Sequence, residues 1–290
     1  MLYRLYVAGI FLARMMPRRI CYLIAVVIAR VYFIFSRKDK QALRENLRVV
    51  LEKGTNPAVI DSHVIGVFRN FAKYLADFFR LSRLSRKYIR KHIEIKGLHY
   101  LDDCLSEGSG AILLTAHLGN WELGGAVIGV LGYPISALVL EHKDKRINDF
   151  FARRRFNNDV RGIPLGVKVK QCFKVLKSNE VLAIVGDKDY TGSNECAEFF
   201  GKKARLPKGA AVLSLKTGAP IILIFVVREK NNTYKIHLNE PIKYEPTGDY
   251  DGDVKTLMGR YLSGFEKYIR EYPDQWYAFE RIWKQKPVIQ

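Results

Sequence analysis

The chain of 290 residues carries near its middle the stretch Ala111-Ile-Leu-Leu-Thr-Ala-His117-Leu-Gly-Asn-Trp-Glu122. The apolar run at 111–116 predicts a buried strand. Gly119 permits a tight turn after that strand, and Asn120 is a residue type that caps helix N-termini. The stretch therefore predicts a strand that ends in a turn and leads into a helix. Open α/β sheets place their sites at such carboxyl ends of strands.

Apolar runs on both sides of this stretch repeat the alternation of strand and helix. We expect strands at 93–95, 111–116, 135–139, 181–185, 221–227 and 234–238. We expect helices at 98–106, 120–131, 144–157, 167–177, 209–217 and 254–272. This alternation is typical of an α/β fold whose sheet carries helices on its faces.

The residues before the first expected strand are helical in pattern. Residues 41–51 place Leu and Val side chains on one face, and a Phe-rich helical stretch at 59–81 follows a break at 54–57. We expect three parts: a membrane-associating helical segment at 1–36, a helical segment at 37–92 packed on the core, and an α/β domain at 93–290.

The N-terminal segment is both apolar and basic. Residues 20–29 are uninterrupted by charge, Arg30 breaks the run, and residues 31–35 resume it. A spanning helix needs about 20 apolar residues, so we expect an interfacial or shallowly inserted anchor instead. The alternative is a first helix that packs on the protein's own core. Basic residues flank or interrupt the apolar faces: Arg14, Arg18, Arg19, Arg30, Arg37, Lys38 and Lys40.

The overall charge restricts the classes of partner. The chain has 48 Lys and Arg against 29 Asp and Glu, a net charge of +19, which suits nucleic acid, an anionic membrane or an acidic protein. It contains no zinc-finger or RNA-recognition signature, which argues against nucleic acid. The four cysteines are scattered, with no pair or cluster typical of a zinc site, so we expect neither a metal nor a structural disulfide.

His117 and Glu122 form a candidate pair of base and orienting acid. On one helix, residues five apart point about 140° away from each other. The two side chains meet only if His117 lies in the turn and Glu122 in the first turn of the helix. In that geometry they would activate a hydroxyl nucleophile, and the helix N-terminus would face a developing oxyanion. A histidine beside a helix-capping acid, without catalytic role, fits the same spacing.

The residues around His117 resemble a known family. The pattern His117-x4-Glu122 is similar to the H-x4-D/E block of bacterial glycerolipid and lipid A acyltransferases, and His-Leu-Gly-Asn-Trp-Glu is similar to the form in late acyltransferases of lipid A biosynthesis. Further blocks follow in the same order: Arg155 before Ile163-Pro-Leu-Gly166, Gly186-Asp-Lys-Asp189, Phe199-Phe-Gly201 through Gly209, Gly218-Ala-Pro220 and Pro273-Asp-Gln-Trp276. The resemblance covers nearly the whole chain.

The resemblance implies a fold like that of glycerol-3-phosphate acyltransferase, with a central mixed, mostly parallel sheet and an N-terminal apolar membrane anchor. It implies transfer of a fatty acyl group from a thioester to a hydroxyl, without a cofactor. His117 would be the catalytic base, and Glu122 would hold its imidazole. The acceptor hydroxyl itself attacks, so the reaction requires no serine or cysteine nucleophile.

The resemblance also implies substrate-binding residues. Arg155 is expected to bind a phosphate or the developing negative charge, although the run 153–155 also fits a solvated helix face. Asp187 and Asp189 are expected to orient Arg155 or the acceptor, or else to cap a turn.

Four more residues are expected at the substrate. Asn120 and Trp121 belong to the histidine block itself. Arg205 and Lys208 are expected to hold a phosphate at a helix start, with surface charge as the alternative. The chain departs from the family at Lys188, where the lipid A enzymes often have Gln, which leaves the acceptor open.

The implied partners are an acyl donor, a lipid acceptor and a membrane surface, with no nucleic acid. Both acyl carrier protein and coenzyme A are acidic donors that a basic surface attracts, and the resemblance favours carrier protein. The acceptor is a lipid A-type or related glycolipid, with a lysophospholipid as the alternative. The implied location is the cytoplasmic face of a bacterial inner membrane. A non-catalytic membrane-surface protein is a further alternative from another class.

Overall fold

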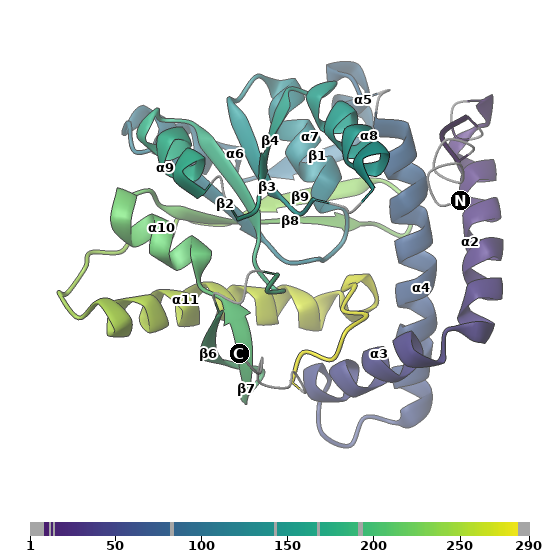
Figure 1. Ribbon diagram of the computed structural model, residues 1–290. Coiled ribbons are helices and arrows are strands. Elements are labelled where there is room, and N and C mark those ends of the chain that lie inside the picture. The colour runs from purple at the N-terminus through teal and green to yellow at the C-terminus, as the bar shows by residue number, and fades with distance from the viewer. Residues whose placement is uncertain are drawn as a thin grey trace.

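The computed structural model describes residues 9–11, 13, 15–81, 84–141, 144–166, 169–190 and 194–283. A seven-stranded sheet forms its centre, with helices on both faces (Figure 1). The strand order is β1-β9-β8-β2-β5-β3-β4, and neighbours are parallel except for the antiparallel pair β8 and β9. The expected α/β fold with a mixed, mostly parallel sheet is confirmed. The strands are β1 (Ile93–Lys96), β2 (Ala111–Thr115), β3 (Ile135–Val139), β4 (Val160–Pro164), β5 (Val181–Val185), β8 (Ile221–Arg228) and β9 (Tyr234–Leu238).

Strand β2 lies at the middle of the sheet, and all its residues are buried. Successive side chains of a strand point to opposite faces. Ile112 and Leu114 accordingly enter the core beneath α9, α10 and α11, whereas Ala111 and Leu113 enter the core beneath α6, α7 and α8. These helices are α6 (Leu98–Ser106), α7 (Trp121–Leu131), α8 (Lys145–Phe156), α9 (Val169–Lys177), α10 (Gly209–Thr217) and α11 (Tyr250–Glu271), with the short η2 (Pro273–Gln275) after α11.

The helices before the sheet form a separate layer at its side (Figure 1). They are α2 (Arg18–Phe35), α3 (Arg37–Val50), α4 (Pro57–Arg80) and α5 (Arg86–His92). Helix α4 begins at Pro57, where the missing N–H is tolerated, and the Asn56 side chain caps it by accepting from Ala58 N at 2.9 Å. It lies between α2 and the body of the molecule, so α2 is the outermost of these helices.

Helix α2 has one buried and one exposed face. Cys21, Tyr22 and Ala29 are buried on the side of α4. Among the described residues no single helix meets the length and apolarity needed to span a bilayer, although α2 and α3 together do so across a 93° bend. Membrane contact of this segment therefore stays a prediction. The exposed apolar residues of α2 are Ile20, Leu23, Ile24, Val27, Ile28, Val31, Tyr32, Ile34 and Phe35.

Some elements differ from the sequence-based expectation. Strand β4 was not expected, because Gly162 and Pro164 weaken a strand pattern; it forms at the sheet edge, where a proline is tolerated. The antiparallel pair β6 (Asn194–Phe199) and β7 (Lys202–Pro207) was missed because its residues are largely polar. Residues 1–8, Arg14, residues 167–168 and residues 284–290, to which the expectations also extended, lie outside the described residues.

Candidate active site

His117 lies in a turn, residues 116–120, that joins β2 to α7. We call these residues the His117 turn. The turn is fixed against the end of β8 and against the segment that follows α11, so the position of His117 depends on parts of the chain far from it in sequence. The main-chain hydrogen bonds run from Gly119 N to Gln275 O (2.9 Å), from Asn120 N to Val226 O (2.8 Å) and from Tyr277 N to His117 O (2.8 Å).

Gly119 is required by the close approach of β8. Its φ is +65°, and a Cβ there would lie 1.9 Å from the carbonyl oxygen of Val226. Any other residue would both strain the backbone and displace the strand. The tight turn expected at Gly119 is confirmed.

Asn120 caps α7, as the sequence predicts. Its Oδ1 accepts from Leu123 N at 3.0 Å, and its Nδ2 donates to the Tyr234 hydroxyl at 3.2 Å. The side chain is fully buried, with both ends of its amide engaged. Asn120 therefore lies behind the turn and supports it, a position different from that expected of a substrate-binding residue.

The carboxylate that holds the His117 ring is that of Asp187. His117 Nδ1 lies 2.5 Å from Asp187 Oδ1, and the histidine side chain is 17% exposed whereas that of Asp187 is fully buried. Asp187 follows β5, which is hydrogen-bonded to β2, so the two residues meet at the same edge of the sheet. The sequence spacing allowed Glu122 to be the partner of His117, but in the structure that partner is Asp187.

Asp187 is kept ionised by its surroundings. Burial alone would raise its pKa, but His117, the Lys188 ammonium and the Trp276 indole together lower the pKa to about 2. Trp276 Nε1 donates to Asp187 Oδ2 at 3.0 Å. An ionised partner on Nδ1 fixes the imidazole tautomer and leaves Nε2 as the basic nitrogen.

Glu122 pairs with Arg155 instead. Arg155 Nη2 lies 2.5 Å from Glu122 Oε1, and Arg155 Nε lies 3.1 Å from Oε2, which makes a two-point contact. The two side chains are 12% and 17% exposed. Burial alone would lower the pKa of Arg155, but Glu122 raises it above its ordinary value, so the guanidinium stays charged. From the family resemblance we expected Asp187 or Asp189 to orient Arg155, but the carboxylate that binds Arg155 is that of Glu122.

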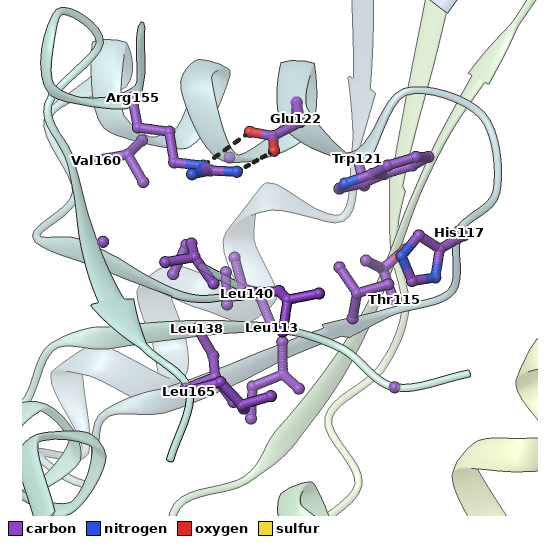
Figure 2. Close-up of a pocket in the computed structure, with 18 of the residues that line it drawn as sticks. Leu113, Thr115, His117, Trp121, Glu122, Leu138, Leu140, Arg155, Val160 and Leu165 are labelled. Carbon is purple, nitrogen blue, oxygen red and sulfur yellow. Dashed lines mark hydrogen bonds and ion pairs between the residues drawn. The ribbon is translucent and has the colours of Figure 1, made fainter. Parts of the chain in front are cut away.

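A cavity of about 1060 Å³ joins these groups. Figure 2 shows His117 and Trp121 on one side of it and the pair of Arg155 and Glu122 on the other. Its volume is at the upper end for small-molecule sites, and most of its wall is apolar, as a long hydrocarbon chain requires. The leucines labelled along the wall are Leu113, Leu138, Leu140 and Leu165.

Three further polar or aromatic side chains line the cavity. Trp121 meets the His117 ring edge to face, with 5.0 Å between ring centres. Lys188 donates to the carbonyl oxygen of Tyr277 at 3.2 Å and forms no ion pair among the described residues. Asp189 accepts from Asn194 at 2.8 Å. Of the three, Lys188 brings a positive charge next to Asp187.

Arg205 and Lys208 lie outside this cavity. Arg205 is exposed on β7, and Lys208 Nζ lies 3.3 Å from the Glu195 carboxylate. Both flank the start of α10, near the position expected from the sequence, but neither lines the cavity. Their phosphate-binding role stays a prediction.

Sequence reasoning missed the contribution of the segment after α11. Trp276 binds Asp187, and Tyr277 both lines the cavity and donates its N–H to His117 O. The block Pro273-Asp-Gln-Trp276 could have drawn attention to this segment. Its own sequence, however, does not indicate which residues it contacts in the folded chain. Among the described residues no group of three or more His, Cys, Asp or Glu side chains is placed to hold a metal ion.

Several proteins similar in sequence to this chain are named as acyltransferases. A phosphatidylinositol mannoside acyltransferase of Mycolicibacterium smegmatis is 25% identical over 96% of this chain and 90% of its own length. One from Mycobacterium tuberculosis is 25% identical over 84% of this chain and 77% of its own. A lipid A biosynthesis palmitoleoyltransferase of Escherichia coli is 25% identical over 69% of this chain and 64% of its own.

Fold and site together define an α/β enzyme in which a histidine, paired with an ionised aspartate, lines a large and mostly apolar cavity. The model of the bacterial lipid A biosynthesis acyltransferase family matches residues 1–285. The chain therefore belongs to that family and is an acyltransferase of the lipid A or glycolipid type.

Proposed function

We propose that the chain transfers a fatty acyl group from an acyl thioester to a hydroxyl of a glycolipid acceptor. The acceptor is of lipid A type or a related phosphoglycolipid, the class to which the named substrates of the similar proteins belong. The observation that carries the proposal is the position of His117. Its ring is held by ionised Asp187 and lines a large, mostly apolar cavity.

His117 acts as the base of this reaction. Its Nε2 takes the proton of the acceptor hydroxyl while the hydroxyl oxygen attacks the thioester carbonyl carbon. The C–S bond then breaks, and the leaving thiolate takes the proton from His117. The products are an ester and a free thiol, and the enzyme returns to its starting state. Asp187 stabilises the imidazolium that exists between the two proton transfers.

The cavity wall holds the acyl chain of the donor. Its apolar lining removes the chain from water, which contributes about 0.8 kcal/mol for each buried CH₂ group. The charged groups of the cavity bind the polar parts of the substrates. Glu122 engages Nε and Nη2 of Arg155, and the remaining nitrogen, Nη1, binds an anionic group of a substrate. The Lys188 ammonium, which also lines the cavity, binds the acceptor.

The donor is an acyl carrier protein or coenzyme A thioester, and the reaction takes place at the cytoplasmic face of the bacterial inner membrane. The net charge of +19 supports an encounter with an acidic donor and with anionic lipid. The exposed apolar residues of α2, with exposed Arg19 and Arg30 on the same helix and exposed Arg37 at the start of α3, support contact with the interface.

Labelled acyl thioester and extracted glycolipid, incubated with the purified protein in mixed micelles, test the proposal. We expect label in the glycolipid fraction with the wild type and none with His117→Ala. Acyl-carrier-protein and coenzyme A donors, offered in parallel, identify the donor. Labelled lysophospholipid-derived product alone, or transfer retained in folded His117→Ala, would overturn it.

A further inference from the structure

A buried polar cluster is hydrogen-bonded to the His117 turn, and its side chains do not line the cavity. At its centre is Asp77 of α4, whose side chain is 9% exposed. Its carboxylate accepts from the Tyr22 hydroxyl, which lies 2.8 Å from both oxygens, and from Arg228 Nη2 at 2.8 Å. It also accepts from the Tyr234 hydroxyl. The cluster joins α2, α4, β8 and β9 at one point.

One route leads from this cluster to the start of α7. The Tyr234 hydroxyl gives its single hydrogen to Asp77 and therefore accepts from Asn120 Nδ2 at 3.2 Å. That contact fixes which end of the Asn120 amide is the acceptor, and Oδ1 caps Leu123 N. The cap of the helix that carries Trp121 and Glu122 thus depends on Asp77.

A second route leads to the turn itself. Arg228 N donates to Gln275 Oε1, and Gln275 Nε2 donates to Arg228 O, both at 2.9 Å. The Gln275 carbonyl accepts from Gly119 N at 2.9 Å, two residues from His117. The strand end that carries the Arg228 side chain is therefore tied to the His117 turn by its main chain.

The far end of the cluster lies on the outermost helix. Tyr22 of α2 is 5% exposed, and besides donating to Asp77 it accepts from Arg228 Nη1 at 2.6 Å. Burial and Asp77 raise the pKa of the Tyr22 hydroxyl, which stays protonated and able to donate. A buried ion pair tolerates the loss of a partner poorly, because each unmatched group keeps its desolvation cost.

We propose that Tyr22 and Asp77 are positioning residues that couple the docking of α2 on α4 to the geometry of the His117 turn. If α2 leaves its place, Asp77 and Arg228 lose a shared partner and shift, and Tyr234 and Gln275 carry that shift to the turn. The helix that we expect to lie on the membrane thereby controls the rate of acyl transfer. This inference rests on the proposed function, in which His117 is the base.

The variant Tyr22→Phe tests the coupling because it removes one oxygen and keeps the ring. Tyr32→Phe is the matched control: it lies on the same helix, and its hydroxyl donates to Asp39 at 2.7 Å on the exposed face. We expect kcat to fall about five- to tenfold in Tyr22→Phe, with KM for donor and acceptor within about twofold. Tyr32→Phe is expected to keep the wild-type kcat.

A double-mutant cycle with Tyr234→Phe separates coupling from loss of stability. If both hydroxyls act through the same cluster, the loss of kcat in the double variant is smaller than the product of the two single losses, whereas independent effects multiply. Wild-type kcat in Tyr22→Phe, a lower thermal midpoint with unchanged kcat, or multiplying losses would overturn the inference. Transfer by His117→Ala would instead overturn the proposed function, whatever Tyr22→Phe does.

Discussion

Two acid–base pairs lie at the same cavity. Figure 2 shows His117, whose partner Asp187 lies outside the lining, on one side of it and the pair of Arg155 and Glu122 on the other. His117 with Asp187 and Arg155 with Glu122 have the same shortest contact, 2.5 Å. They differ in the basic partner: an imidazole can accept and release a proton, whereas a guanidinium keeps its protons. The first pair is therefore suited to move a proton and the second to hold a fixed charge. The comparison yields predictions that separate the two carboxylates.

Replacing His117 gives the largest effect. We expect His117→Ala to lower kcat by about 10³-fold or more, since no other group then accepts the hydroxyl proton. The thermal midpoint should also fall, because Asp187 is left fully buried without its histidine partner, so kcat is compared on protein shown to be folded. His99→Ala, at an exposed histidine on α6, is the control and should keep full activity. Turnover of folded His117→Ala near the wild-type rate would contradict the assignment of the base.

Replacing Asp187 gives the next largest effect on turnover. We expect Asp187→Asn to lower kcat about 10²-fold, because a neutral amide neither fixes the tautomer nor stabilises the imidazolium. Asp103→Asn, at an exposed aspartate of α6 that does not line the cavity, is the control and should keep the wild-type kcat. Equal losses in the two variants, measured as kcat at saturating donor, would remove the distinction.

Replacing Glu122 is expected to act on stability more than on proton transfer. Glu122→Gln leaves the Arg155 charge buried without its partner, which costs about 3 kcal/mol of the free energy of unfolding. Denaturant unfolding measures that loss. The pH dependence of kcat should keep its wild-type shape, whereas that of Asp187→Asn should change. A change of shape in Glu122→Gln as well would mean that the two pairs are not separate.

Because the pKa of Asp187 is lowered in the folded chain, the free energy of unfolding is expected to decrease at low pH. The pKa is about 2 in the folded chain against an ordinary value of 3.8, so the ionised carboxylate stabilises the fold above pH 3.8. That contribution, about 2 kcal/mol, is lost as the pH falls from about 4 to about 2. Between about pH 4 and about pH 2, the free energy of unfolding should depend less steeply on pH in Asp187→Asn than in the wild type. An unchanged slope would indicate that the folded-state pKa is not lowered.

Replacing Lys188 is expected to have the smallest effect, and that effect is on KM for the acceptor. We expect Lys188→Gln to raise KM for a phosphate-bearing acceptor about threefold and to leave KM for the donor within error, because we propose that the ammonium binds the acceptor. Competition between anionic and neutral acceptors measures the preference. An increase in the donor KM alone would place Lys188 at the donor instead.

Much of the fold could be predicted from local pattern. The apolar runs at 111–116 and 181–185, and the Gly119 turn with the Asn120 cap, have causes that lie within a few residues, and the structure confirms them. Polar segments were harder: β6 and β7 form because they pair with each other, and β4 is stabilised by its neighbour β3. Their own residues carry little strand signal.

The sequence by itself determined the family resemblance, the α/β fold and the place of His117 at the end of a buried strand. Only the tertiary structure decided which carboxylate is hydrogen-bonded to His117. Asp187 lies 70 residues from His117 and reaches it because β2 and β5 pair side by side, while Glu122 turns with its helix toward Arg155. Spacing along a chain limits local geometry, but the partner of a side chain is set by which strands become neighbours.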